Sequence, residues 1–288
     1  MLLVPSPFFA YNGTVFGQMM LLWRNIMTPP VLSIITVCFR AKSTLQTTMD
    51  NVLRQTFRPL EYLVIDGGSD DGTTDLLKQY TSSFSQKDIS FRYLSEPDHG
   101  IYDAMNKGSR MASGTWLLFL NAGDLLADDH VLEQIFAAST SADILYGDTL
   151  CIYQGNTKKY PALPLDYLTY EMSFCHQSAL IRRELLLEHP YDTSYKVCAD
   201  HQFFLSMYLQ KKTFQYYPVP IAIYEIAGYS DNNKMLSHRE KHRMQKELGI
   251  FHFSVRWLLR ECSFYCKQSI KQLFGQKLID LVRKKRLH

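Results

Sequence analysis

The sequence predicts an α/β fold, with a mainly parallel sheet flanked by helices and a helical extension at the C-terminus. Short apolar runs rich in branched and aromatic residues alternate with helix-like segments through the first half of the chain. Such alternation is typical of strand–helix–strand units, whose strands run parallel and whose helices cover the sheet. Residues 254–288 instead place Leu, Ile, Phe and Trp at helical spacing, with Arg and Lys between them.

Composition limits the classes of protein to consider. The 288 residues are 46% hydrophobic and 20% charged with a net charge of +3, which is typical of a globular protein and excludes a disordered or nucleic-acid-coating one. We expect one large domain at residues 31–230, an appendage at 1–30 and an extension at 231–288. Prolines and polar residues interrupt the apolar patches of the appendage, so we expect neither a cleaved signal nor a membrane span there. The six cysteines form no Cys-x-x-Cys pair, which indicates neither a zinc site nor a disulfide framework and favours the cytoplasm.

Each predicted strand is followed by a polar cluster. The strands are expected at residues 31–39, 60–66, 89–94 and 115–121, and the helices at 44–54, 73–80 and 102–111. The clusters read RAKS, DGGSDDGT, SEPDHG and NAGD in chain order. Because ligands of such sheets bind beyond the carboxyl ends of the strands, we expect the functional site there.

The loop DGGSDDGT has two interpretations. Its glycines permit a tight turn and its polar residues can cap the next helix, so it is an ordinary strand-to-helix connection on one interpretation. On the other, Asp66 accepts a hydrogen bond from a nucleobase or a ribose. The loop lacks both the Gly-x-Gly-x-x-Gly spacing of a dinucleotide fold and the Gly-Lys-Ser/Thr ending of a P-loop.

The loop NAGD suits a hard divalent cation. An apolar strand delivers Asn121 and Asp124 through a small Ala-Gly step that lets a bulky ligand approach the backbone. Mg²⁺ and Mn²⁺ prefer oxygen ligands and are commonly held by one or two carboxylates together with substrate phosphates. The alternative is a turn that caps a helix beginning near Asp128.

Six segments together resemble the family 2 glycosyltransferases with the GT-A fold. They are ITVCFR, VIDGGSDDGT, EPDHGIYDAMNKG, LLFLNAGD, FCHQSALIRREL and YKVCADHQFF, in this order. The sequence is most similar to enzymes of colanic-acid-type exopolysaccharide and O-antigen clusters. The resemblance covers roughly residues 31–230, the size of one α/β domain.

The resemblance implies a site for a nucleotide-diphosphate sugar and a divalent cation, Mn²⁺ or Mg²⁺. In this family the first two polar loops bind the nucleotide, and the loop after the fourth strand holds the metal. Asp124 is then the metal carboxylate, because Asn121 and Gly123 stand where acids are usual. Gly67 likewise replaces one of two adjacent acids. The donor contacts implied are Thr36, Arg40, Asp66, Asp98, Lys107 and Asn121, with Asp103 as a further candidate; a solvated helix surface is the alternative for Lys107.

The same resemblance places the general base at Asp200. A carboxylate within hydrogen-bond reach of an acceptor hydroxyl can take its proton while a sugar leaves its diphosphate. The alternative for Asp200 is an acid favoured by the dipole at a helix N-terminus. His176 and Gln177 are expected on the acceptor or diphosphate side, with a core histidine as the alternative. Gly228 and Ser230 match a loop that closes over the donor, or form a surface turn.

The expected reaction is transfer of one sugar per encounter, with inversion, to a hydroxyl of a saccharide acceptor. A polyprenyl-diphosphate-linked acceptor is expected, because the basic amphipathic end of the chain suits the inner face of the cell membrane. Packing of that helix on its own domain is the alternative. The segment FSVRW at 253–257 lacks the Gln of the Gln-x-x-Arg-Trp signature of processive synthases.

Two other classes of function remain open on the sequence. A nucleotidyltransferase would also use a metal, but TVCFRAKST lacks the glycines of a phosphate-binding loop. A non-catalytic nucleotide-sugar-binding scaffold would explain the missing acids of NAGD. The catalytic interpretation requires Asp124 and Asp200 to share one cleft.

Overall fold

The computed structural model describes residues 31–153, 155–225, 233–251, 261–263, 265, 266 and 269. The chain divides into two compact units, Met1–Lys241 and His242–His288, and the division falls within helix α9 (Lys234–Glu247). The first unit holds the sheet, its flanking helices and every described residue of the predicted site.

The four predicted strands are confirmed as the parallel half of one sheet. They are β1 (Leu32–Cys38), β2 (Leu60–Asp66), β3 (Ile89–Ser95) and β4 (Trp116–Phe119), in the spatial order β3-β2-β1-β4. All residues of β1, β2 and β4 are buried, which explains why they read as continuous apolar runs rather than as alternating ones. The strands therefore end together at one edge, followed by the polar loops.

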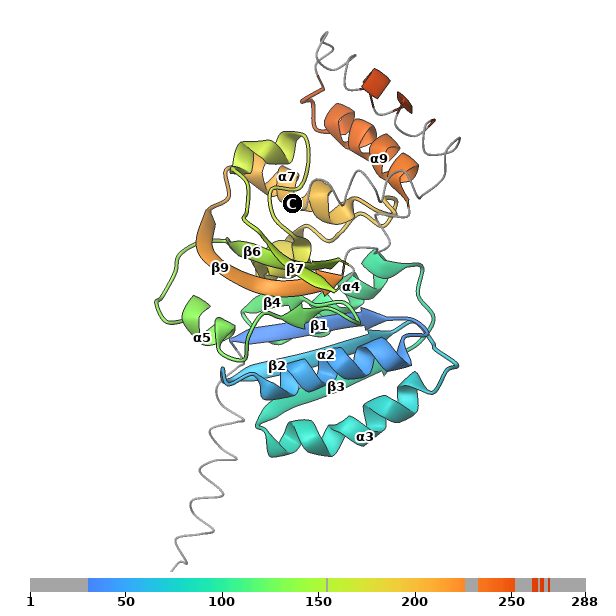
Figure 1. Cartoon of the computed structure of the whole chain (residues 1–288), viewed down its shortest axis with the longest axis vertical. Coiled ribbons are helices and arrows are strands. Elements are labelled where there is room, and N and C mark those ends of the chain that lie inside the picture. The colour runs from blue at the N-terminus through green and yellow to red at the C-terminus, as the bar shows by residue number, and fades with distance from the viewer. Residues whose placement is uncertain are drawn as a thin grey trace, which may run out of the picture. The chain divides into compact units, whose positions relative to one another are not determined.

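The predicted helices cover both faces of this half (Figure 1). They are α2 (Lys42–Arg54), α3 (Thr73–Gln86) and α4 (Ile101–Met111). Leu45 and Met49 of α2 belong to one buried apolar cluster with Ile34, whose neighbour Ile35 points to the other face of the sheet. There it meets α4 at Gly108, where an added Cβ would lie 2.6 Å from Ile35 Cγ2. Glycine at this position thus lets α4 approach the sheet closely.

The other half of the sheet is mixed, and its strands were not predicted. The nine-stranded sheet of the described residues continues from β4 to β8 (Ala179–Arg182), β6 (Ile144–Tyr153), β9 (Phe214–Glu225) and β5 (Leu125–Leu126), while β7 (Asn156–Tyr160) pairs with β6. β4 and β6 each run antiparallel to β8, whereas β6 and β9 are parallel. The predicted parallel sheet is therefore extended by a mixed one.

Short helices connect the strands of the mixed half. They are α5 (Val131–Ile135), η1 (Leu165–Thr169), η2 (His176–Ser178), α6 (Arg183–Glu188) and α7 (Ala199–Leu209). Two of them, η2 and α7, contribute residues to the wall of the site. α7 begins at the predicted base, since Asp200 lies in its first turn.

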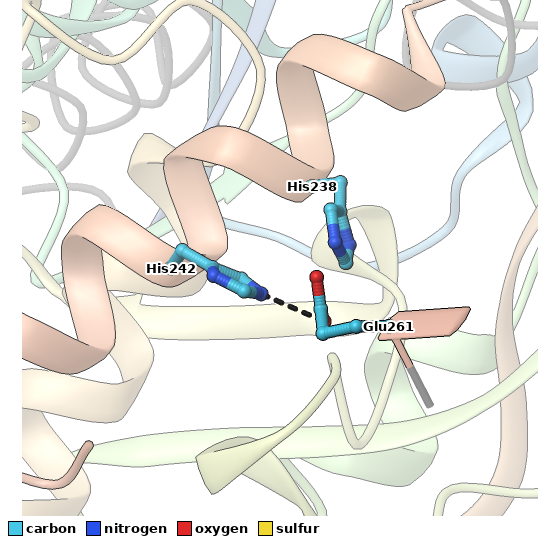
Figure 2. Close-up of side chains that lie close together, drawn as sticks. All are labelled: His238, His242 and Glu261. Atoms are coloured by element: carbon cyan, nitrogen blue, oxygen red, sulfur yellow. Dashed lines mark hydrogen bonds and ion pairs between the residues drawn. The ribbon is translucent and has the colours of Figure 1, made fainter. Parts of the chain in front are cut away.

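In the second unit His242 Nε2 lies 2.9 Å from Glu261 Oε1 (Figure 2).

Among the described residues, no helix has the length and apolar character to cross a membrane. Most of the basic amphipathic segment 254–288, and the appendage 1–30, lie outside the described residues.

Candidate active site

Asp124 and Asp200 line the same cavity of about 930 Å³ in the first unit. The two residues come from opposite halves of the sheet, since Asp124 follows β4 and Asp200 opens α7. Asn121, predicted as a donor contact, also lines the cavity, as do His176 and Gln177, predicted on the acceptor or diphosphate side. The geometric requirement of the catalytic interpretation is therefore met.

A tight turn fixes the position of Asp124. The Asp124 amide donates to the Asn121 carbonyl at 2.9 Å, and Gly123 adopts a φ of 102°, which favours glycine. From α2, the Thr48 hydroxyl accepts from the Gly123 amide at 2.8 Å and lies 2.9 Å from the Asp124 carbonyl oxygen. The small residues of NAGD therefore serve the turn, and they leave the Asp124 carboxyl facing the cavity.

Burial raises the pKa of Asp124 to about 6, although hydrogen bonds from Gln177 and Asn121 oppose the rise. Gln177 Nε2 donates to Asp124 Oδ2 at 2.8 Å, and Gln177 Oε1 lies 2.8 Å from the Cys175 thiol sulfur. Cys175 thereby orients the side-chain amide of Gln177, and this amide in turn holds the Asp124 carboxyl. The carboxylate of Asp124 is available to a ligand above about pH 6.

The atoms at this turn fit a hard divalent cation. Asn121 Oδ1 is buried and has no hydrogen-bond partner among the described residues, which is unusual for a buried polar atom. It lies on the same turn as the Asp124 carboxylate, and both residues line the cavity. One carboxylate and one amide oxygen are suitable ligands for Mg²⁺ or Mn²⁺ when phosphate oxygens of a substrate supply the rest.

Asp200 is held at the N-terminus of α7 by two donors to one oxygen. The Tyr102 hydroxyl lies 2.9 Å from Asp200 Oδ1, and the His201 amide donates to the same atom at 2.9 Å. Burial and then the nearby Asp200 charge raise the pKa of the Tyr102 hydroxyl well above its usual value, so it remains a donor. Among the described residues, no hydrogen bond reaches the second oxygen, Asp200 Oδ2.

His176 borders Asp200 but belongs to the core. Its Nδ1 lies 3.9 Å from Asp200 Oδ2, and its Nε2 lies 2.9 Å from the Tyr191 hydroxyl oxygen. Burial lowers the pKa of His176, which favours the neutral imidazole despite the adjacent carboxylate. His176 is therefore both a core histidine and a residue of the cavity wall, as the two interpretations of the sequence proposed separately.

The loop before α7 is anchored from a distant helix. Buried Glu240 on α9 accepts hydrogen bonds from three successive backbone amides, those of Lys196, Val197 and Cys198, at 2.6, 2.9 and 2.9 Å. The Val197 carbonyl in turn lies 2.8 Å from the Tyr102 hydroxyl. Glu240 therefore fixes the segment that presents Asp200.

A second cavity of about 460 Å³ adjoins the first beyond β1. Asp98 and the exposed ring of Phe39 both line it. An added Cβ at Gly67 would lie 2.7 Å from Asp98 Oδ2 and 3.3 Å from the Phe39 ring. Asp98 thus occupies the space toward which a side chain at position 67 would point. The carboxylate of Asp98 therefore lies where an acidic side chain at position 67 would place its own.

Three residues predicted to contact the donor line neither cavity: Thr36, Asp66 and Lys107. Thr36 is fully buried and accepts a hydrogen bond from the Tyr62 hydroxyl at 3.0 Å. Asp66 is also fully buried, and its carboxylate accepts from the Ser69 amide at 3.0 Å and the Ser95 hydroxyl at 2.6 Å. It therefore organises the DGGSDDGT loop, and a donor contact by Asp66 stays a prediction.

The third residue is Lys107, whose ammonium is already paired with carboxylates and whose donor contact stays a prediction. It lies 2.9 Å from Glu96 and 3.7 Å from Asp103, and donates to the Pro97 carbonyl at 3.0 Å. Lys107 lines neither cavity, and these contacts stabilise the turn between β3 and α4.

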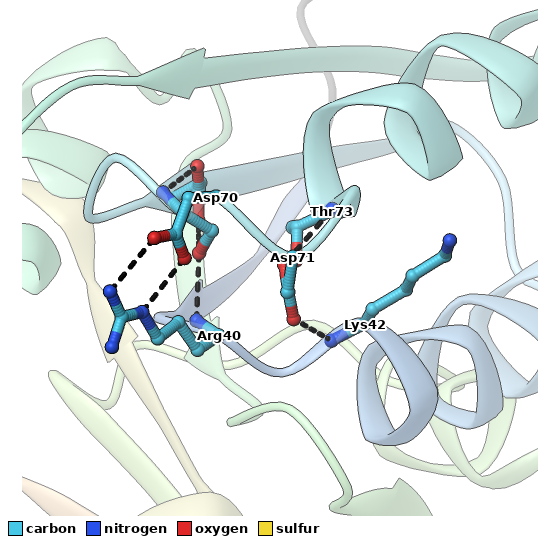
Figure 3. A network of polar contacts seen from close by, with 7 residues as sticks. Arg40, Lys42, Asp70, Asp71 and Thr73 are labelled. Atoms are coloured by element: carbon cyan, nitrogen blue, oxygen red, sulfur yellow. Dashed lines mark hydrogen bonds and ion pairs between the residues drawn. The ribbon is translucent and has the colours of Figure 1, made fainter.

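Arg40 lies in a polar network at the ends of β1 and β2 (Figure 3). Its guanidinium contacts both carboxylate oxygens of Asp70 at 2.8 Å, and its amide donates to Ser69 Oγ at 2.7 Å. Asp71 accepts from the amides of Lys42 and Thr73, each at 3.1 Å. The network joins the first two polar loops. It does not line either cavity, so a donor contact by Arg40 stays a prediction.

Two residues of the site were missed by sequence reasoning. Tyr102 and Lys196 line both cavities, and both lie within motifs that carried the resemblance, EPDHGIYDAMNKG and YKVCADHQFF. Tyr102 is a buried aromatic residue of α4 and Lys196 an exposed lysine of the loop before α7, and neither gives a signal without the fold that joins them. Gly228 and Ser230 lie outside the described residues, so their role stays a prediction.

Comparisons with known proteins agree with this geometry. A model of the family described as glycosyl transferase family 2 matches residues 33–262. A PGL/p-HBAD biosynthesis glycosyltransferase of Mycobacterium bovis (strain BCG / Pasteur 1173P2) is 32% identical over 230 residues, covering 78% of this chain and 88% of the relative. An uncharacterized glycosyltransferase of Mycobacterium tuberculosis (strain CDC 1551 / Oshkosh) is 29% identical over 219 residues, covering 73% and 79%.

Solved structures share the fold at low identity. A mannosyltransferase of Pyrobaculum calidifontis, in complex with GDP-Man and Mn²⁺, gives a TM-score of 0.59 at 16% identity and covers 84% of this chain and 74% of its own. Residues 1–349 of TarS from S. aureus, in complex with UDP-GlcNAc, give 0.56 at 16% identity; the match covers 68% of this chain and 59% of TarS 1–349. The chain therefore belongs to glycosyl transferase family 2, and it is a glycosyltransferase with the GT-A fold.

Proposed function

We propose that this glycosyltransferase moves one sugar per encounter, with inversion, from a nucleotide-diphosphate donor to a hydroxyl of a saccharide acceptor in surface polysaccharide biosynthesis. The observation that carries the proposal is the shared cavity of Asp124 and Asp200. It holds a carboxyl suited to a metal and a carboxyl suited to a base. Each role needs a different environment, and Asp124 and Asp200 differ in burial and in hydrogen-bond partners.

The donor is expected to span both cavities. The nucleoside would occupy the smaller one, where Phe39 offers a ring for stacking and Asp98 a carboxylate for a base or ribose. The diphosphate would lie where the two cavities meet, and the sugar would enter the larger one. Structural relatives were solved with UDP-GlcNAc and GDP-Man, which supports a nucleotide sugar as the donor class.

The chemistry follows from the placement of Asp200. Its free oxygen would accept the proton of an acceptor hydroxyl while that oxygen forms a bond to the anomeric carbon of the donor. The bond from this carbon to the diphosphate breaks, and its electron pair leaves with the nucleoside diphosphate. Direct attack from the face opposite the leaving group inverts the anomeric configuration. When bound at Asp124 and Asn121, Mn²⁺ or Mg²⁺ would supply positive charge for the diphosphate.

The mouth of the large cavity suits a sugar ring. Four exposed large side chains fall within residues 160–170: Tyr160, Leu163, Tyr167 and Tyr170. Tyr160 and Leu163 also line the cavity. Contiguous exposed apolar side chains mark binding surfaces, and tyrosine combines a flat apolar face with a polar tip. This composition supports a saccharide as the acceptor.

A lipid-linked acceptor, with the protein peripheral on the inner face of the cell membrane, is the second part of the proposal. The support is the basic amphipathic composition of residues 254–288. Sedimentation with anionic vesicles before and after removal of residues 255–288 tests it. Loss of binding on removal is expected, and equal recovery of the two proteins would reject membrane contact through this segment.

The activity is tested by a screen of nucleotide sugars for Mn²⁺-dependent thermal stabilisation, since a ligand of the native state raises its stability. Donors that stabilise the protein are then incubated with saccharide acceptors, and the anomer of the product is determined. A product with the donor's own anomeric configuration would exclude inversion. Binding of nucleotide sugars without turnover on any acceptor would instead favour a non-catalytic scaffold.

A further inference from the structure

The two cavities meet at five residues that line both of them. These are Ile101, Tyr102, Asn121, Ala122 and Lys196. Among the described residues that line either cavity, Lys196 is the one lysine or arginine. A cation therefore stands at the junction where the proposed donor changes from nucleoside to sugar.

The backbone of Lys196 is fixed while its ammonium remains available. Its amide donates to buried Glu240 at 2.6 Å, and its Nζ donates to the Thr193 carbonyl at 3.0 Å. Within the part of the chain that the structure describes, Lys196 forms no ion pair. Arg40 and Lys107 differ in this respect, since Asp70 holds the first and Glu96 the second.

The negative charges around the junction favour a cation at this position. Four carboxyl groups line the two cavities: Asp98 and Asp103 the smaller, Asp124 and Asp200 the larger. A bound diphosphate would add further negative charge. On the metal side the turn offers one carboxylate, that of Asp124, because Asn121 and Gly123 are neutral. An ammonium beside the diphosphate would therefore share the task of neutralising it.

We propose that Lys196 is a catalytic residue that binds the donor diphosphate and stabilises the departing nucleoside diphosphate. This inference rests on the proposed function. The ammonium donates hydrogen bonds to phosphate oxygens and keeps its proton throughout. The bond from the anomeric carbon to the diphosphate oxygen breaks, and its electron pair, which stays on that oxygen, is the charge that Lys196 faces.

The test compares the binding of UDP, GDP and the corresponding nucleosides by calorimetry, with and without Mn²⁺. Lys196→Met keeps the length of the side chain and removes its charge, while Lys196→Arg keeps the charge. Loss of one charge-assisted hydrogen bond weakens binding by about 10- to 100-fold. We expect this loss for the diphosphate that the wild type binds, unchanged affinity for its nucleoside, and partial recovery in Lys196→Arg.

Lys87→Met is the matched control, because Lys87 is an exposed lysine that lines neither cavity. It should bind the diphosphate like the wild type. Diphosphate affinity in Lys196→Met within about twofold of the wild type would overturn the role of Lys196 and leave the proposed function intact. A wild-type protein that binds no nucleoside diphosphate, whichever its base, would overturn both. Equal losses for nucleoside and diphosphate would show a general defect of the site and also reject the inference.

Discussion

Within the described part of the chain, the Tyr102 hydroxyl is the one side-chain donor in hydrogen-bond distance of the proposed base. It comes from α4, whereas Asp200 comes from α7, and the two atoms lie 2.9 Å apart. A hydrogen bond to an ionised carboxylate is stronger than one between neutral groups, and it also fixes the rotamer of the side chain. Tyr102 therefore holds Asp200 ready for the acceptor.

Tyr102→Phe is expected to lower kcat by about tenfold, because a charge-assisted hydrogen bond to the base is lost. The KM for the donor should change little if nucleotide contacts are retained. Tyr62→Phe is the control, since it removes an equally buried hydroxyl that contacts Thr36 in the core. Steady-state kinetics of both variants decide the matter: equal kcat in the two would deny Tyr102 a role beyond packing.

Asp124 leads to a prediction about stability and pH. Its folded-state pKa is raised to about 6 by burial, so ionisation of the free protein opposes folding above that pH. Without metal, Asp124→Asn should therefore be more stable than the wild type at about pH 8, by up to about 3 kcal/mol. The difference should vanish near about pH 4, where the wild-type carboxyl is neutral.

Denaturant unfolding of both proteins at the two pH values, with a chelator present, measures this effect. Mn²⁺ should stabilise the wild type at the higher pH and leave Asp124→Asn unchanged, because the variant lacks the carboxylate. A variant that is less stable than the wild type at every pH would contradict the account of Asp124.

At the level of elements, the sequence predicted the parallel half of the sheet and missed the mixed half, for physical reasons. The strands β1, β2 and β4 are buried on both faces, so their apolar runs stand out. β9 contains Pro218 and Pro220, which cannot donate to a neighbouring strand, and β7 is fully exposed with two lysines. Their pairing depends on long-range contacts that no local pattern encodes.

The loop between α6 and α7 also depends on a distant element, helix α9. Glu240→Gln replaces an oxygen that accepts backbone amides with an amide nitrogen that faces them. We expect it to lower the free energy of unfolding by about 2 kcal/mol and to reduce kcat by more than tenfold. The reason is that Val197 and Cys198 lead directly into Asp200.

Nucleoside binding separates this effect from a general loss of fold. The proposed nucleoside contacts, Phe39 and Asp98, lie outside the affected loop, which reaches the smaller cavity through Thr193, Tyr195 and Lys196. Nucleoside binding that depends on Phe39 and Asp98 should therefore persist in folded Glu240→Gln. Wild-type kcat in the variant would show that α9 does not position the base.

At the scale of the whole molecule, the site exists because two differently built halves of one sheet meet. The resemblance predicted Asp124 and Asp200 correctly as neighbours of one cavity. Thr36, Asp66 and Lys107 line neither cavity, so their donor contacts stay predictions; a polar residue beside a ligand loop can equally well support the loop from within. Tyr102 and Lys196 became visible only when the fold joined two cavities at their side chains.

The most direct test of the central claim is the rate of glycosyl transfer by Asp200→Asn, measured together with its affinity for the donor nucleotide. Loss of the base should reduce kcat by about 10²- to 10⁴-fold while nucleotide affinity stays at the wild-type value. Such a result would place Asp200 on the chemical step alone. Transfer at the wild-type rate, from a variant that still binds the donor, would contradict the account.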